Sequence, residues 1–146
     1  MSKHDEIEKI KQLKARYLRF LDTRQWIQWR ELFTEDVVAD YGNNQAVKTT
    51  GVDLLLEMTS AILEGAISVH HAHTPEIILI DESHATGIWA MEDIINATDY
   101  DLHGFGYYHE TYIKVDGYWK ICRIKLTRLK RDLIKKTNLK VDVRQD

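Results

Sequence analysis

The chain has 146 residues, of which 44% are hydrophobic and 29% are charged, and its formal net charge is −3. A chain of this length buries roughly two-thirds of its unfolded surface, so we expect one domain with a core that needs no disulfide or metal. This composition excludes a disordered chain, and the lack of an apolar run near the ~20 residues of a membrane span excludes a transmembrane helix.

The first predicted element is an amphipathic helix of about five turns near the N-terminus. Its apolar residues recur at spacings of three and four, the period of one helix face: Ile7, Ile10, Leu13, Tyr17, Leu18 and Leu21. Tyr17 lies near the centre of this stripe and Asp22 nearer to its edge. The residues before the helix are charged and lack the apolar core of a secretory signal, so we expect a cytoplasmic protein.

Three shorter elements are predicted between this helix and residue 66. The sequence favours a short helix from Trp26 to Phe33, then a strand from Asp36 to Tyr41 followed by a turn at residues 42–44. A third helix is predicted to begin at residues 50–53. Its apolar stripe consists of Leu54, Leu55, Met58, Ile62 and Leu63.

From residue 66 onward the chain is rich in β-branched and aromatic residues, which favour strands. Helices followed by a run of antiparallel strands predict an α+β fold with the helices on one face of a curved sheet. Pro75 predicts a bulge or bend within the first long strand. The four long strands are predicted over residues 67–80, 84–97, 103–115 and 118–130, with tight turns at 81–83 and 116–117.

Strand alternation places two charged side chains on apolar faces. Asp93 falls on the face of Trp89 and Met91. Arg128 falls on one face with Cys122, Ile124 and Leu126. A buried charge is costly unless a carboxylate or ligand meets it. Two interpretations stay open: the two charges form one buried ion pair, or several elements direct polar groups into a pocket.

The other face of the sheet has mixed character. The same alternation places Arg123 and Lys125 on that face, together with Ile121 and Tyr108. A sheet with helices on only one side leaves its second face to be covered, and packing between subunits is a common solution. We therefore expect a homo-oligomer.

Three of the seven histidines lie within residues 69–73. On a strand, His71 and His73 share one face and His70 takes the other. The H-x-H spacing suits metal ligands, but two ligands do not make a site. His103 and His109 are further candidates by residue type alone, so we expect no metal site.

Two other features exclude common site types. The single cysteine, Cys122, excludes an intramolecular disulfide and a cysteine-based zinc site, and it fits a reducing cytosol. The G-x-G at residues 104–106 is not followed by the helix that a dinucleotide cradle needs, which favours a bend or bulge in the sheet.

Charge is unevenly distributed along the chain. Residues 1–113 have a balance of −10 and residues 114–144 a balance of +8. A basic segment can contact nucleic acid or anionic lipid, or it can pair with the acidic remainder of the same fold or its oligomer. Because the whole chain is acidic, we favour the second interpretation and expect neither nucleic acid nor a membrane as a partner.

Across roughly residues 7–131 the chain resembles the SnoaL-like branch of the nuclear transport factor 2-like superfamily. Within that branch the pattern is closest to the bile-acid 7α-dehydratases, and remoter from scytalone dehydratases and hexachlorocyclohexane dehydrochlorinases. The resemblance rests on segments 17–22, 70–77, 86–93 and 112–119, with Trp26, Tyr41 and Arg128.

The resemblance implies a cone-shaped α+β fold, with N-terminal helices packed on a strongly curved antiparallel sheet. Residues 1–131 would form a single domain, and residues 132–146 a C-terminal tail that is either a lid or disordered. The related dehydratases are trimers and other members are dimers, so we expect a trimer, with a dimer as the alternative.

Six site residues follow from the same resemblance. The catalytic histidine falls on His70 and its acidic partner on Asp22. Two functional tyrosines, a further pocket carboxylate and a pocket arginine fall on Tyr17, Tyr41, Asp93 and Arg128. We further expect the substrate to contact Trp89, Met91, His103 and Tyr107.

These residues predict a general base built as a dyad. Asp22 would accept the Nδ1–H of His70 and leave Nε2 free to take a proton. The tyrosines would donate to a substrate carbonyl, Asp93 would protonate a leaving hydroxyl, and Arg128 would stabilise negative charge. This chemistry requires no metal, nucleotide or redox cofactor.

The predicted function is therefore that of a cofactor-independent dehydratase or isomerase. Its substrate would be an apolar hydroxy-carbonyl compound of steroid or polyketide type. The alternatives are a non-catalytic small-molecule-binding module of the same fold, and an assembly module whose pocket is filled by side chains.

Overall fold

The structure, a computed structural model, describes residues 1–42 and 48–136. It begins with α1 (Lys3–Asp22), whose N-terminus is closed by a capping box in which Ser2 and Asp5 each accept the other's backbone N–H. The predicted apolar stripe is confirmed, because all of its members except the half-buried Ile7 belong to the core or pack against it. One charged residue, Lys14, is buried within the same stripe.

Four short elements follow α1: α2 (Trp26–Arg30), β1 (Phe33–Asp40), β2 (Lys48–Thr50) and α3 (Val52–Leu63). The prediction that the second helix extends to Phe33 was wrong. The carbonyl of Leu32 accepts the N–H of Ile121, and Phe33 pairs with the same residue, so these residues join the sheet instead. The sequence did not predict β2. Of the predicted turn at residues 42–44, positions 43 and 44 lie outside the described residues.

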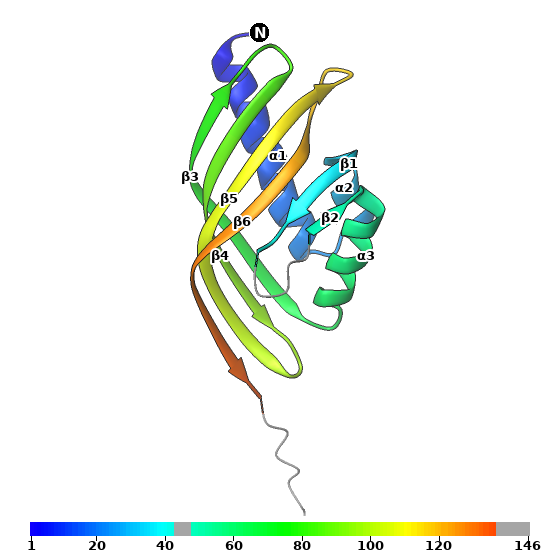
Figure 1. The fold of residues 1–146 in the computed structure, drawn as a ribbon, viewed down its shortest axis with the longest axis vertical. Helices are drawn as coiled ribbons and strands as arrows, with labels where there is room; N and C mark the ends of the chain where they lie inside the picture. The colour runs from blue at the N-terminus through cyan, green and yellow to red at the C-terminus, as the bar shows by residue number, and fades with distance from the viewer. Residues whose placement is uncertain (43–47, 137–146) are drawn as a thin grey trace, which may run out of the picture.

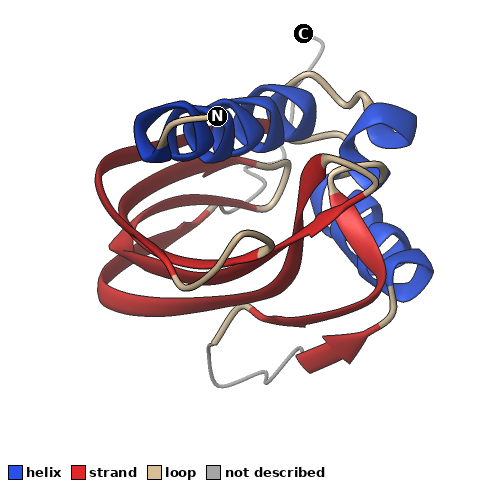
Figure 2. Cartoon of the chain, turned by 90° about the horizontal axis from the view of Figure 1, so that it is seen from above, coloured by secondary structure: helices blue, strands red, loops and turns tan. Residues whose placement is uncertain are grey.

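Four long strands complete the fold: β3 (Ile67–Leu79), β4 (His84–Asn96), β5 (Tyr100–Val115) and β6 (Tyr118–Lys135). The sheet order is β2-β1-β6-β5-β4-β3, and every pairing is antiparallel except that of β1 with β6. Figure 1 shows α1 crossing behind the long strands, while α2 and α3 lie beside β1 and β2. Figure 2 shows the sheet curving around an interior that the helices cover, which confirms the predicted fold class.

The last strand is longer than the sequence predicted. It continues to Lys135 instead of ending at residue 130, so residues 132–135 of the predicted tail are paired with β5. Residues 137–146 of that tail lie outside the described residues. The division into a domain and a tail stays a prediction.

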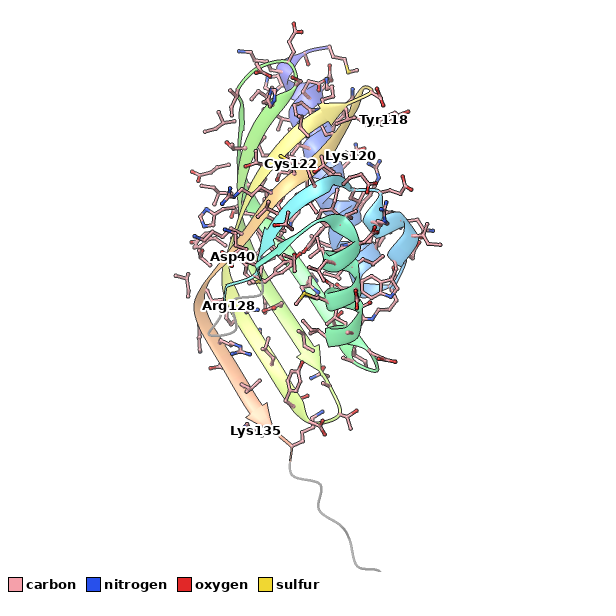
Figure 3. All side chains as sticks on the ribbon, turned by 45° about the vertical axis from the view of Figure 1, so that its right-hand side comes forward. Asp40, Tyr118, Lys120, Cys122, Arg128 and Lys135 are labelled. Atoms are coloured by element: carbon pink, nitrogen blue, oxygen red, sulfur yellow. The ribbon has the colours of Figure 1, made fainter. Side chains whose placement is uncertain are left out.

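Irregular positions in the strands decide which side chains face the interior. The bend predicted at Pro75 is confirmed, because the pairing of β3 with β4 shifts between His73 and Glu76. In β6, Cys122 is an extra residue between two pairs with β5, and so is Leu129. Each bulge reverses the alternation of side chains. Figure 3 labels Cys122 on β6, between Tyr118 at one end and Lys135 at the other.

The bulge at Cys122 explains one wrong prediction. Ile121 was expected on the outer face, but it is fully buried. Strict alternation from the buried Ile124 would place Ile121 outside, and the extra residue Cys122 reverses that alternation. Cys122 itself is half-buried and does not continue the row of buried residues that Ile124 begins. The prediction that Arg123 and Lys125 face outward is confirmed, since both are exposed.

The orientation of β5 also differs from the prediction. Tyr108 was expected outside, but it is buried, whereas its neighbour Tyr107 is 40% exposed. The reason is the pairing of β5 with β4, which places Tyr108 directly opposite the buried Trp89. Residues opposite one another in two paired strands share a face of the sheet.

Among the described residues, no helix combines the length and apolar character needed to span a bilayer.

Candidate active site

A cavity of about 910 Å³ lies between the sheet and the helices. Its volume falls in the range of small-molecule sites. Much of its wall is apolar, and the apolar residues come from both helices and strands: Leu21, Leu55, Met58, Ile62, Leu63, Ile95, Leu102, Leu126 and Leu133. Thr49 on β2 also lines it, and among the described residues its buried hydroxyl has no hydrogen-bond partner.

His70 lines the cavity and is held by Asp22 at two points. The Nδ1 atom of His70 lies 2.7 Å from Oδ1 of Asp22, and the backbone N–H of His70 donates to Oδ2 at 2.7 Å. The hydroxyl of Ser68 donates to the same carboxylate at 2.9 Å. With the carboxylate as acceptor, Nδ1 carries the ring hydrogen and Nε2 remains an acceptor. The predicted pairing of these two side chains is thus present in the structure.

Arg24 connects the end of α1 to the start of β3, and the sequence did not indicate this residue. Its guanidinium donates to the Ser68 hydroxyl at 2.7 Å, and to the carbonyls of Leu21 and Ala66 at 2.8 and 2.7 Å. Its backbone has a φ of 59°, a left-handed conformation that non-glycine residues rarely adopt. These contacts fix the last turn of α1, and with it Asp22, against His70.

Two tyrosines meet at the cavity wall, one from α1 and one from the residue after β1. Their hydroxyl oxygens, on Tyr17 and Tyr41, are 3.1 Å apart, and both residues line the cavity. Burial raises the pKa of both phenols above the ordinary value, so both keep their protons at neutral pH. Because one hydroxyl donates to the other, the pair has one hydrogen left to offer to a ligand.

Asp93 and Arg128 form a bidentate salt bridge in the cavity wall. Nη1 and Nη2 of Arg128 donate to the two carboxylate oxygens of Asp93 at 3.0 and 2.9 Å. Gly104 lies between them on β5, and a Cβ atom there would overlap both side chains. The two interpretations left open by the sequence are therefore compatible, because the ion pair is itself part of the cavity lining.

A second ion pair is completely buried and was not predicted. Nζ of Lys14 lies 2.7 Å from Oε2 of Glu110, and neither side chain is exposed. The other oxygen of Glu110 accepts the hydroxyl of Tyr112 at 2.7 Å, which in turn accepts the indole N–H of Trp89 at 2.9 Å. Two features of the sequence could have indicated this pair. Lys14 lies within an apolar helix stripe, and Glu110 alternates with Tyr108 and Tyr112 along its strand.

The predicted substrate-contact residues do not line the cavity. Trp89 and Met91 are buried on the inner face, but they belong to the core instead of the cavity wall. His103 lies on the outer face, with Nε2 2.6 Å from Oε1 of Glu92, and Tyr107 lies on the same outer face. These two placements correct the prediction. Of the two neighbours Tyr107 and Tyr108, it is Tyr108 that lines the cavity.

The remaining histidines of the cluster point away from the cavity. His71 and His73 share the outer face, with ring centroids 6.1 Å apart. In the described ranges, no group of three histidine, cysteine or acidic side chains is arranged to hold a metal ion.

Comparisons with known proteins agree with this architecture. The sequence model of a family described as the SnoaL-like domain matches residues 3–125. A scytalone dehydratase-like protein from Novosphingobium aromaticivorans DSM 12444 is 26% identical, over 87% of this chain and 86% of that one, with a TM-score of 0.80. Rv3472 from Mycobacterium tuberculosis, of unknown function, is 25% identical over 86% of this chain and 77% of that one, with a TM-score of 0.74.

A third structure shares the fold at lower identity. The hexachlorocyclohexane dehydrochlorinase LinA-type3 from Novosphingobium barchaimii LL02 is 14% identical, covers 92% of each chain and has a TM-score of 0.77. Resemblance to the scytalone dehydratase and dehydrochlorinase groups is thereby supported. The closer resemblance to bile-acid dehydratases stays a prediction.

Proposed function

The chain belongs to the SnoaL-like domain family, and from that premise we propose that it is a cofactor-independent lyase or isomerase with His70 as general base. The observation that carries this proposal is the contact of His70 with Asp22 at the wall of a largely apolar cavity. The structural neighbours include a scytalone dehydratase-like protein and a dehydrochlorinase, which supports a lyase.

The proposed base works through the free ring nitrogen. Asp22 holds the hydrogen on Nδ1, so Nε2 of His70 takes the α-hydrogen of a bound carbonyl compound as a proton. The carboxylate stabilises the imidazolium that forms, and such a base contributes on the order of 10²–10⁴ in rate. The proton then leaves with the β-hydroxyl as water, which makes the overall reaction an elimination without any oxidant or reductant.

The proposed electrophile is the tyrosine pair. As the α-proton leaves, negative charge develops on the carbonyl oxygen, and the remaining hydroxyl hydrogen of Tyr17 or Tyr41 donates to it. Tyr41 is the more exposed of the two, since Tyr17 is only 1% exposed, so we assign the substrate contact to Tyr41. Tyr17 then donates to Tyr41 and orients it.

The proposed leaving-group side is the ion pair of Asp93 and Arg128. Both carboxylate oxygens of Asp93 are engaged by Arg128, and the pair faces the cavity, where it can hydrogen-bond the departing hydroxyl. The buried hydroxyl of Thr49, which has no hydrogen-bond partner within the described part of the chain, adds a further point for an oxygen substituent. We therefore propose an apolar ligand with several oxygen functions, such as a polycyclic hydroxy-ketone.

The experiment is a mass-spectrometric assay with a panel of polycyclic hydroxy-ketones, including steroid and decalin compounds. We expect loss of one water by the wild type, and loss of at least about 100-fold in rate for His70→Ala and Asp22→Asn. Because the two residues act as a unit, the double variant loses little more than either single variant.

The outcomes separate the alternatives. Compounds that bind without a change in mass would support a non-catalytic binding module instead. No binding of any apolar compound would support an assembly module. Wild-type rates in a folded His70→Ala variant would overturn the proposed base.

We also propose that the chain forms a homo-oligomer, a trimer or alternatively a dimer, through the outer face of the sheet. Apolar side chains are exposed on that face, among them Val69, Ile88 and Tyr107. Burial of such a surface between subunits is the usual reason for it on a small domain.

A further inference from the structure

The buried ion pair of Lys14 and Glu110 has no part in the chemistry proposed above. It joins α1 to β5 across the core, with Nζ 2.7 Å from Oε2 and both side chains unexposed. Replacing such a pair with apolar residues of similar volume is often neutral or stabilising, so stability alone is weak grounds for its presence.

Lys14 lies against two of the cavity tyrosines. Its Nζ is 3.9 Å from the ring centroid of Tyr17 and 3.5 Å from that of Tyr108. The two rings meet edge to face, with centroids 6.0 Å apart. Both tyrosines line the cavity, and the hydroxyl of Tyr17 contacts that of Tyr41. The ammonium is therefore one aromatic ring away from the cavity.

The two charges of the ion pair have different surroundings, and only the positive charge lies against the cavity tyrosines. The carboxylate of Glu110 is engaged by Lys14 on one oxygen and by Tyr112 on the other. The ammonium, in contrast, rests on the faces of the cavity tyrosines. A cation on a ring face is attracted by its π electrons and draws electron density from the ring. The phenol hydroxyl thereby becomes a stronger donor.

We propose that Lys14, held by Glu110, is a positioning residue that tunes the tyrosines of the cavity to stabilise negative charge on a bound oxygen. This inference rests on the proposed function, in which that oxygen is the enolate oxygen of the substrate. The ammonium of Lys14 is completely buried and held in place before the reaction, and electrostatic stabilisation is most effective at such preorganised, low-dielectric positions. Lys14 does not contact the substrate and acts through Tyr17 and Tyr108.

The test uses 2-naphthol as a probe, an apolar phenol whose fluorescence distinguishes its neutral form from its anion. Its ionisation constant in the cavity is measured in the wild type and in Lys14→Met/Glu110→Gln, which removes both charges together and leaves no unpaired buried charge. We expect the acid dissociation constant of bound naphthol to be about tenfold lower in the variant, which means that its pKa rises by one unit. Lys14→Gln/Glu110→Gln serves as a second variant should the first fail to fold.

The chain offers a matched control pair. Glu6 and Lys114 also form an ion pair between α1 and β5, and neither lines the cavity. Glu6→Gln/Lys114→Met should leave the acid dissociation constant of bound naphthol unchanged. Tyr41→Phe should lower that constant. An unchanged ionisation constant in both folded Lys14 variants would overturn the inference.

The probe separates this inference from the proposed function. The ionisation of bound naphthol is measured without any elimination step, so it does not depend on turnover of a substrate. A tenfold effect of the Lys14 variants without any elimination activity in the wild type would support the inference and refute the proposed reaction. On an accepted substrate, the same variants should lower kcat and leave KM nearly unchanged.

Discussion

Gly104 shows how one missing side chain shapes the candidate site. It lies opposite Asp93 in the pairing of β4 with β5, and Arg128 reaches across it from β6. A Cβ atom at this position would meet Nη1 of Arg128 and Oδ1 of Asp93. The glycine therefore allows the ion pair to lie flat against the sheet and to form part of the cavity wall.

Gly104→Ala should break this ion pair. We expect the free energy of unfolding to fall by about 3 kcal/mol, the cost of disrupting a buried charge pair. In an Asp93→Ala/Arg128→Ala background, the same substitution should cost about 1 kcal/mol or less, because nothing remains for the methyl group to displace. Urea unfolding measures both values. Equal costs in the two backgrounds would contradict this account of Gly104.

At this scale the sequence was informative where a residue's face followed from simple alternation. Asp93 and Arg128 were predicted to face inward, and both line the cavity. Tyr107 was chosen over Tyr108 because the orientation of β5 depends on its pairing with β4, which the sequence does not display. The importance of Lys14 was missed because lysine is seldom buried, so its place in the helix stripe was passed over.

At the scale of the element, α1 carries three of the groups discussed above. Lys14, Tyr17 and Asp22 lie along its buried side or at its last turn. Its first turns are attached to the far end of the sheet by Glu6, which accepts from Lys114 Nζ at 2.6 Å and from the Trp119 indole N–H at 2.7 Å. The helix is thus held near both of its ends.

The attachment at Glu6 predicts a pH dependence of stability. The hydrogen bond from Lys114 lowers the pKa of Glu6 to about 2, against an ordinary value of 4.5. Because the folded-state pKa lies below the unfolded one, this contribution is present above about pH 4.5 and is lost as the pH falls toward 2. Between pH 5 and 2, the free energy of unfolding should therefore fall more steeply in the wild type than in Glu6→Gln. Parallel pH profiles of the two proteins would argue against it.

The two bulges of β6 mark the limit of element prediction from this sequence. The existence and type of the long strands followed from composition, and the β3–β4 and β5–β6 turns from turn residues, but the start of β5 was predicted too late and the end of β6 too early. The extra residues Cys122 and Leu129 are neither glycine nor proline, so nothing in the local sequence marks them as bulges. Counting by twos through such positions placed Ile121 on the wrong face.

At the scale of the whole molecule, the uneven charge distribution has a structural counterpart. Several basic residues of the C-terminal quarter pair with acids from the remainder of the chain: Lys114 with Glu6, Arg128 with Asp93 and Lys136 with Asp101. These are contacts within one subunit. They agree with the interpretation that the basic segment pairs with the acidic part of the same fold.

The proposed oligomer can be tested on the outer face of the sheet. Ile88→Arg and Tyr107→Arg place a charge on this exposed apolar surface and should dissociate the assembly, since an unpaired charge at the centre of an interface is costly to desolvate. Ile27→Arg is the matched control, because Ile27 is exposed on α2 instead. Light scattering should give three times, alternatively twice, the chain mass for the wild type and the control. A monomeric wild type would contradict the proposal.

The most direct test of the central claim is the transfer of deuterium from D2O to the α-carbon of a bound ketone, because it reports proton abstraction without requiring a leaving group. The measurement uses a set of bicyclic and steroid ketones, with mass spectrometry as readout. We predict exchange in the wild type and a loss of at least about 100-fold in His70→Ala. Exchange at equal rates in both proteins, or none in the wild type with ketones that bind, would contradict the assignment of His70 as the base.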